Sequence, residues 1–304
     1  MKKLLSILLA CFCGFTLFAC KKDKVKEEIT IDGIIYKYSK YNEGYYTSGV
    51  SDTTITQLKP VDYIDDIPVN HIGHSSFSEC KKLQQVELPD TIKEIDDKAF
   101  KACSSLSSMN LPTSLEQIGS EAFSLCSSLV SISIPDKITA IEWGTFNSCS
   151  ALSNITLPNT LKAIGNSSFE NCSSLSSIHL PDEIETIGDK AFLECTSLTE
   201  INLPNSITSL GIMLFWGCKS LECIKVPNQI TEIPRWFVFD CEQLANVYIP
   251  KSVKKISEGA FGYNYSAIIP KVYYQGTKEE WNKISIEEKN KRLINNYSIT
   301  FNSY

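Results

Sequence analysis

Hydrophobic residues recur along this chain with a fixed period of 23 residues, from about Val69 to Tyr274. The cysteine column of this pattern is Cys80, Cys103, Cys126, Cys149, Cys172, Cys195, Cys218 and Cys241. The phenylalanine column, three residues earlier, is Phe77, Phe100, Phe123, Phe146, Phe169, Phe192 and Phe215. The proline column is Pro89, Pro112, Pro135, Pro158, Pro181, Pro204, Pro227 and Pro250. A fixed period of roughly 20 to 29 residues is typical of a solenoid, in which each unit buries its apolar side against its neighbours.

One unit, Leu106 to Ser128, shows which elements the period predicts. Leu106, Met109 and Leu111 have the spacing of a short strand whose apolar side chains turn inward. Pro112 follows, and because proline lacks an N–H and has a fixed φ, it ends the strand at the same place in every coil. A glycine recurs farther on, which predicts either a bend with positive φ or a close backbone approach. The glycines of this column are Gly73, Gly119, Gly165, Gly188 and Gly211.

The unit as a whole reads L-x-x-I-x-L-P-x-x-[IL]-x-x-I-G-x-x-A-F-x-x-C-x-x. This variant resembles the BspA-like leucine-rich repeats of bacterial surface proteins, over about two thirds of the chain. The resemblance implies a leucine-rich repeat solenoid of about eight to nine coils with short parallel strands at 69–274, a β-rich N-terminal cap at 29–68 and a small mixed C-terminal cap at 275–304. It also implies adhesion to host proteins or neighbouring cells.

The eight aligned cysteines are predicted to be buried free thiols that act as small hydrophobic residues. Coils lie roughly 4.8 Å apart, but stacked side chains point the same way, which suits disulfide geometry badly. The sequence has no C-x-x-C pair and no histidines at ligand spacing, so no metal site is predicted. Cys223 differs because it lies on an outward column, where it is either shielded by its neighbours or available for intermolecular pairing.

The first 19 residues have the pattern of a bacterial lipoprotein signal peptide. Two lysines precede an apolar run that is too short for a transmembrane helix. The tetrad that ends at Cys20 (Leu-Phe-Ala-Cys) resembles a lipobox, which implies lipidation of Cys20 after cleavage. Phe18 departs from the small residues usual at its position, and the alternative is an ordinary secretory signal cut nearby. The charged stretch 20–28 is expected to be a solvated tether, or alternatively a surface-export tag.

Charge restricts the partners of the chain. Twenty-nine basic residues stand against 35 acidic ones, a formal net charge of −6, which argues against binding to nucleic acid. We expect an exported protein that is held in the bacterial outer membrane by its N-terminal lipid alone. The expected location is the cell surface, and the periplasmic side is the alternative.

The two ends of the solenoid need caps, because an open end exposes an apolar cross-section. Alternating Tyr36 and Tyr38 predict strands within 29–68, with Asn42-Glu43-Gly44 as the turn between them. The tyrosines of this region are expected to cover the first coil, a ligand-stacking platform being the alternative.

At the other end, Thr277 and Glu280 predict a capping box that opens a short helix. The Tyr273–Thr277 run, followed by Trp281, is similar to the C-terminal cap of the same family. The alternating Tyr297, Ile299 and Phe301 predict a closing strand.

Outward positions of the predicted strands form the first candidate binding surface. In the middle coils they are small and polar, and the more distinctive residues lie farther on, namely His179, Glu200, Asn202, Lys225 and Tyr248. Such a face suits weak contacts with proteins or with the hydroxyls and amides of glycans. A hydrophilic face that only keeps the sheet soluble is the alternative.

The second candidate surface is a departure from the repeat in the seventh and eighth coils. Positions that are polar in most other coils become apolar or aromatic there, with Trp143 as a lone earlier case. The residues of this candidate partner patch are Ile212, Met213, Trp216, Arg235, Trp236 and Phe239. If these positions face solvent, they form an apolar patch on the convex flank, of the kind that marks partner contacts. The alternative is that 237–239 repack the coil and that the C-terminal cap covers it.

Enzyme signals are scarce. The three histidines have no nearby carboxylate pair or nucleophile, and no G-x-S-x-G, P-loop or H-E-x-x-H motif is present. We therefore expect neither catalysis nor a cofactor. The sequence favours a lipid-anchored binding protein whose partners are host or neighbouring-cell proteins or glycans. The alternative is an accessory lipoprotein that docks onto another envelope protein.

Overall fold

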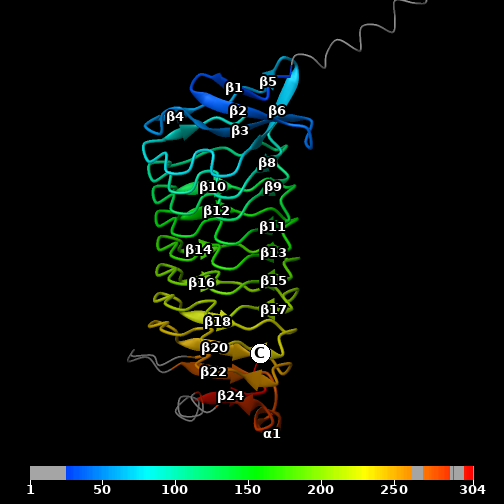
Figure 1. Ribbon diagram of the computed structural model, residues 1–304. Coiled ribbons are helices and arrows are strands. Elements are labelled where there is room, and N and C mark those ends of the chain that lie inside the picture. The colour runs from blue at the N-terminus through cyan, green and yellow to red at the C-terminus, as the bar shows by residue number, and fades with distance from the viewer. Residues whose placement is uncertain (1–24, 262–269, 288–289, 291–297, 304) are drawn as a thin grey trace, which may run out of the picture.

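The computed structural model describes residues 25–261, 270–287, 290 and 298–303. The chain winds into an elongated solenoid whose coils each contribute one strand to each of two parallel ladders (Figure 1). Strands one coil apart pair in parallel at the 23-residue spacing, as Ser131 does with Asn154. The repeat solenoid predicted from the sequence is confirmed.

The first ladder corresponds to the predicted L-x-x-I-x-L strand. It comprises β4 (Gln57–Leu58), β7 (Gln85–Val86), β10 (Ser131–Ser133), β12 (Asn154–Thr156), β14 (Ser177–Ile178), β16 (Glu200–Ile201), β18 (Cys223–Lys225), β20 (Asn246–Ile249), β22 (Lys271–Tyr274) and β24 (Ile299–Phe301). Single bridges at Ser108 and Asn110 continue it between β7 and β10.

The second ladder forms where each coil carries its Ile-Gly pair, and the sequence did not predict it. It comprises β6 (Ile67–Ile72), β8 (Glu94–Ile95), β9 (Gln117–Ile118), β11 (Ala140–Ile141), β13 (Ala163–Ile164), β15 (Thr186–Ile187), β17 (Ser209–Leu210), β19 (Glu232–Ile233), β21 (Lys255–Ile256) and β23 (Ser285–Ile286). Most of these strands are only two residues long, too short for an alternating pattern to show in the sequence.

Between the ladders lies a continuous core of stacked side chains. The phenylalanine rings from Phe77 to Phe215 are fully buried and stack on one another, with centroids 5.5 to 5.7 Å apart. Each ring therefore shields the next from water along the whole solenoid, which is why the repeat keeps one residue type in this column.

The cysteine column is buried and free, as predicted. It also has a polar role that the sequence did not show. From Cys103 on, each thiol donates a hydrogen bond to the phenylalanine carbonyl of the preceding coil, as Cys149 does to Phe123 at 3.1 Å. Burial raises the pKa of the Cys149 thiol to about 12, so it stays protonated and can donate.

A close backbone approach, and not a bend with positive φ, explains the glycine column. A Cβ on Gly119 would lie 2.5 Å from the amide nitrogen of Asp97, and one on Gly211 would lie 2.2 Å from the carbonyl carbon of Gly188. Neighbouring coils thus approach each other at this column. Positive φ occurs two residues later in the coil, for example at Glu121.

The N-terminal cap is an antiparallel sheet of β1 (Glu28–Ile31), β2 (Ile34–Ser39) and β3 (Gly44–Val50), joined to the solenoid through β6, which also pairs with β5 (Tyr63–Ile64). Tyr36 and Tyr45 are fully buried, as covering the first coil requires, whereas Tyr63 is 54% exposed. Tyr41 is 97% exposed and contributes nothing to that cover.

The C-terminal cap contains α1 (Lys278–Trp281), which begins with the predicted capping box between Thr277 and Glu280. Trp281 packs edge-on against Tyr274, and β24 pairs with β22 to close the first ladder. Tyr297 of the predicted closing strand lies outside the described residues, as does Cys20. In the part of the chain that the structure describes, no helix is long and apolar enough to cross a membrane.

Candidate functional site

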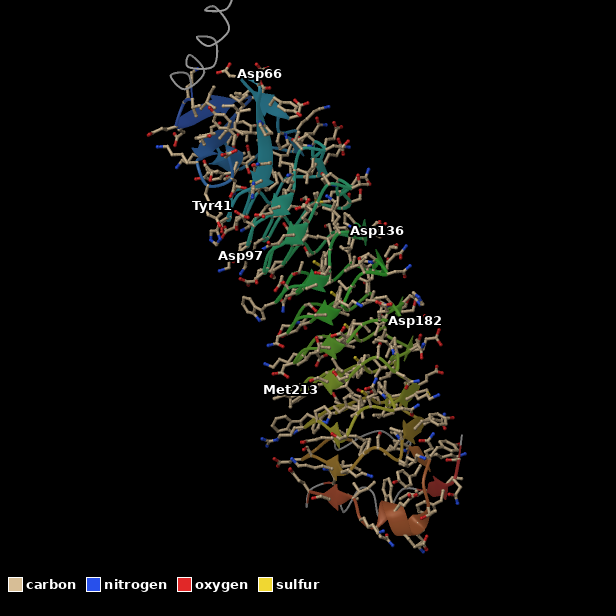
Figure 2. All side chains as sticks on the ribbon, turned by 90° about the vertical axis from the view of Figure 1, so that its right-hand side faces the viewer. Tyr41, Asp66, Asp97, Asp136, Asp182 and Met213 are labelled. Atoms are coloured by element: carbon tan, nitrogen blue, oxygen red, sulfur yellow. The ribbon has the colours of Figure 1, made fainter. Side chains whose placement is uncertain are left out.

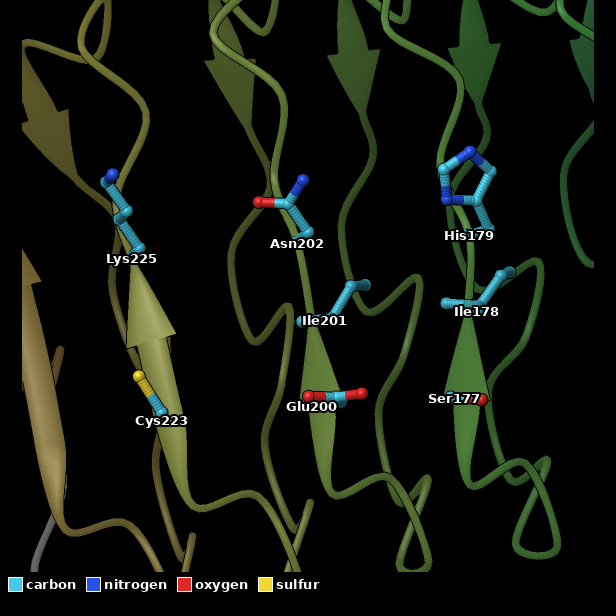
Figure 3. A pocket seen from close by; sticks show the side chains of 8 residues that line it. All are labelled: Ser177, Ile178, His179, Glu200, Ile201, Asn202, Cys223 and Lys225. Atoms are coloured by element: carbon cyan, nitrogen blue, oxygen red, sulfur yellow. The ribbon is translucent and has the colours of Figure 1, made fainter.

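The outward residues of three adjacent strands line an open hollow of about 470 Å³ on the first ladder. Figure 3 shows His179, Asn202 and Lys225 in one row and Ser177, Glu200 and Cys223 in a parallel row. The buried Ile178 and Ile201 lie between the rows and form the floor. The structure thus brings together four of the five strand-face residues singled out from the sequence.

Parallel register explains why these side chains meet. Ser177 pairs with Glu200, so every second residue of neighbouring strands faces the same way. Within the described residues, no hydrogen bond or ion pair holds the side chains of His179, Glu200 or Asn202. Their polar atoms are therefore available to a ligand.

Tyr248, the fifth strand-face residue, lies outside the lining of the hollow but continues its row. It follows Lys225 in register one coil later and stacks on Tyr273, with ring centroids 4.7 Å apart and an interplanar angle of 12°. Both rings are partly exposed. Burial and the neighbouring Cys223 and Tyr273 raise the pKa of the Tyr248 hydroxyl, which keeps it neutral.

Four of the six residues of the second candidate surface form one contiguous cluster. The Trp216 ring lies 4.7 Å from Phe239 and 6.2 Å from Trp236, between ring centroids. The Arg235 guanidinium lies 4.5 Å above the Trp236 ring and also pairs with Glu258. We call this cluster, together with Ile212 and Met213, the aromatic flank.

The aromatic flank is partly open to solvent. Ile212 is 38% exposed, and the rings of Trp216, Trp236 and Phe239 are each partly exposed. The alternative drawn from the sequence, that 237–239 repack the coil, does occur beneath the aromatic flank. Phe237 occupies the column that holds alanine in other coils, and Val238 occupies the phenylalanine column. The Phe237 ring meets the Phe215 ring edge-on. The core is thus repacked while the outer rings stay partly exposed.

Two residues of the aromatic flank have an unusual backbone. Met213 and Trp236 have φ values of 57° and 52°, in the left-handed region that glycine favours. The next residue of the same column, Gly259, is itself at φ 63°, and a Cβ there would lie 2.6 Å from Trp236. The Trp236 ring therefore lies over Gly259 of the next coil, where there is no side chain.

Sequence reasoning missed two members of these surfaces. Leu193, partly exposed, precedes Trp216 in the column after phenylalanine, and Tyr273 stacks on Tyr248. Leu193 lies at a repeat position already singled out, so the period itself was the signal for it. Tyr273 pairs with Tyr248 at a spacing of 25 residues, where the last coil departs from the 23-residue period, so the period gave no signal for it.

His71 belongs to the fold rather than to either surface. His71 is buried and lies 2.8 Å from the Asn70 side-chain oxygen and 2.7 Å from the Glu94 carboxylate. The side-chain nitrogen of Asn42 also lies 2.9 Å from this ring, which brings the cap against the second ladder. Among the described residues, no group of three or more His, Cys, Asp or Glu could hold a metal ion.

Comparison with known proteins identifies the repeat. The family model for the BspA type leucine rich repeat region matches residues 64–176 and 162–292, in six copies. A leucine-rich repeat protein from Bacteroides ovatus is 28% identical, with a TM-score of 0.65 over 81% of this chain and 70% of that one. The T. pallidum leucine rich repeat protein is 31% identical, with a TM-score of 0.60 over 64% of this chain and 90% of that one. No curated protein matches the sequence. This chain belongs to the BspA-type leucine-rich repeat family.

Proposed function

We propose that this protein is a non-catalytic binding protein of the bacterial cell envelope that recognises host or neighbouring-cell molecules through its first ladder. The observation that carries the proposal is the hollow between β14 and β18, where His179, Glu200 and Asn202 converge with no side-chain hydrogen bond or ion pair among the described residues. Membership of a family of leucine-rich repeat proteins supports recognition of a macromolecular partner. Many copies on one cell would turn weak contacts into firm attachment.

The N-terminal pattern supports export and anchoring. Residues 1–19 would be removed as a signal peptide, and Cys20 would carry the lipid that holds the solenoid at the outer membrane. We place the solenoid on the outside of the cell, with 20–28 as its tether. Antibody to residues 29–304 is expected to label intact cells. Labelling that requires permeabilised cells would contradict this location and the adhesive role with it.

Adhesion itself is tested by paired variants. Glu200→Ala with Asn202→Ala removes two polar groups from the hollow and is expected to lower attachment of the cells to immobilised host extracellular matrix several-fold. Ser108→Ala with Asn110→Ala changes the same two columns far from the hollow, and attachment should remain. Equal attachment in all strains would contradict a binding role for the hollow.

The aromatic flank favours a second candidate function, docking onto another envelope protein. Contiguous, partly exposed tryptophan and phenylalanine rings are characteristic of interface hot spots. Trp216→Ser with Trp236→Gly is expected to release the protein from a high-mass complex on native gels of detergent-solubilised envelopes. Trp143→Ser, a half-exposed tryptophan outside the cluster, is the control and should leave the complex intact. Identical migration of all three proteins would contradict the docking role.

A further inference from the structure

We propose that the hollow on the first ladder binds a carboxylate-bearing sugar unit of a glycan chain that lies along the coils. This inference rests on the proposed function and specifies the chemistry of its ligand. It follows from the division of the hollow into two rows, from its open shape and from the stacked tyrosines beside it.

The two rows of the hollow differ in charge. One row presents the Asn202 amide and the Lys225 ammonium, whose nitrogens donate hydrogen bonds, and the His179 ring, which donates through one N–H; Lys225 adds a full positive charge. The other row presents the Glu200 carboxylate, which only accepts. A matching ligand therefore carries an anionic acceptor over the first row and a neutral donor, such as a hydroxyl, over the second. A carboxylated sugar carries both groups on one ring.

The shape of the hollow selects an extended ligand. Sites for small molecules enclose most of the ligand in an apolar cavity, whereas this hollow is open and spans three coils at their roughly 4.8 Å spacing. Only the isoleucine floor is buried. A chain of sugar units can lie across such a surface and make one set of contacts per coil.

The tyrosine pair extends the same surface. Tyr248 follows Lys225 in the donor row, and stacking on Tyr273 holds its ring in place. The C–H face of a sugar ring packs well on such an aromatic surface, because both are apolar and flat. A glycan that fills the hollow and continues along the ladder reaches this pair.

Two other ligand classes fit the hollow less well. Nucleic acid is disfavoured by the net charge of −6 and by Glu200 within the hollow. An extended peptide would add itself to a free strand edge, but β16 lies between β14 and β18, so the hollow offers no edge. An acidic peptide bound through side chains alone is an outcome that the experiment separates.

The test uses trigalacturonate and its methyl ester, which share rings and hydroxyls and differ in charge. Calorimetric titration of the full-length protein is expected to show binding of the acid, and at least about tenfold weaker binding of the ester. Asn202→Asp adds a negative charge without changing size, and Lys225→Met removes the cation. Each should weaken binding of the acid about tenfold or more, and Asn202→Asp should affect the ester little. Lys162→Met, at an ion pair with Glu183 beside the second ladder, is the control.

Three results would overturn the proposal. They are equal binding of acid and ester, binding of hexaglutamate as tight as that of trigalacturonate, and no binding of either saccharide at millimolar concentration. The proposed function fails by a different result, since cell attachment is measured with the Glu200→Ala, Asn202→Ala strain whatever the ligand. Loss of attachment in that strain without binding of the acid saccharide would overturn the glycan inference alone.

Discussion

Equivalent repeat positions on the flank of the solenoid carry charged side chains in some coils and aromatic side chains in others. In the coils from Lys98 to Glu121 these positions carry charges: Lys101 lies 2.6 Å and Lys98 3.4 Å from the Glu121 carboxylate. We call these three residues the ionic flank. In the coils from Met213 to Phe239 the equivalent positions carry the aromatic flank. Asp97, beside the ionic flank, and Met213 lie along the same edge of the molecule in Figure 2, opposite Asp136 and Asp182.

The comparison separates what the repeat requires from what it permits. Both flanks place a large side chain over a glycine of the next coil, Glu121 over Gly144 and Trp236 over Gly259. The buried columns beneath them stay nearly constant, while the side chain above the glycine changes from charged to aromatic. The first ladder changes along the same direction, from serine and asparagine to the residues of the hollow. The C-terminal coils are therefore the specialised part of a uniform scaffold.

The largest effect is expected when the core common to both regions is broken. Phe146 is fully buried between Phe123 and Phe169, with ring centroids 5.5 and 5.6 Å away. Phe146→Ala removes both stacking contacts and leaves a cavity, so the free energy of unfolding should fall by about 3 to 5 kcal/mol. Urea denaturation monitored by circular dichroism measures the change.

Trp143 is the matched control for this substitution. It is three residues away and 51% exposed, so Trp143→Ala should change the free energy of unfolding little. Comparable losses in the two variants would contradict a core built on the phenylalanine stack.

The second prediction separates the cysteine column, present in both regions, from Cys223, which occurs only in the specialised coils. The pKa of about 12 for Cys149 leaves roughly one thiol in ten thousand ionised at pH 8, and its side chain is fully buried. Partial burial also raises the pKa of Cys223, but that side chain is partly exposed. Iodoacetamide should therefore modify Cys223 at least about a hundredfold faster than Cys149, as measured by peptide mapping.

Unfolded protein in urea provides the control for that measurement, because both thiols should then react at similar rates. Similar rates in the native protein would mean that the coils open readily, and would contradict a rigid cysteine column.

The buried half of this architecture was predictable from the sequence because every coil repeats the same packing constraint. Phe100, Cys103 and Leu106 recur in register, and a column that keeps one residue type over many coils has one environment. The short β8 and β9 were not predictable, since two residues show no alternation. Nor was the ion pair of Lys101 with Glu121, which are 20 residues apart and meet only when the coils stack.

The sequence predicted which residues line the hollow, but not how their side chains are arranged. His179, Glu200, Asn202 and Lys225 stood out because the same columns carry small polar residues in the middle coils. Whether such residues pair with each other or stay available depends on distances between coils. Lys162 and Glu183 do form an ion pair between coils, whereas His179, Glu200 and Asn202 have no side-chain partner among the described residues, and no sequence rule distinguishes the two cases.

A smaller effect is expected when the ionic flank is neutralised. Burial opposes ionisation of Glu121, but the hydrogen bonds and charges of Lys101 and Lys98 outweigh it and lower its pKa. A carboxylate with a lowered pKa stabilises the fold above its unfolded pKa, and this contribution is lost as pH falls through the lowered value. Glu121→Gln should therefore cost about 1 kcal/mol at pH 7, and the difference should vanish in acid.

Thermal unfolding of both proteins between pH 7 and pH 3 measures this convergence. Glu116→Gln, at an exposed pair with Lys137, serves as the control and should behave like the wild type. A Glu121→Gln difference that persists unchanged at the lowest pH would show that packing, rather than charge, holds this flank.

The smallest effect is expected when the aromatic flank is returned to the pattern of the repeat. Trp236→Gly loses contacts with Trp216 but relieves a bulky residue at φ 52°, a conformation that costs on the order of 1 kcal/mol. The net change in the free energy of unfolding should stay within about 1 kcal/mol. Ser167→Gly, at φ 53° in the same column, gives the backbone contribution without a ring, so the difference between the two variants isolates the ring. If the ring alone contributes several kcal/mol, Trp236 is part of the core, and the aromatic flank loses its claim to be a docking surface. If the ring contributes little to the free energy of unfolding, stability does not explain why this position carries a tryptophan, since other coils fold with glycine there, as at Gly144 and Gly259.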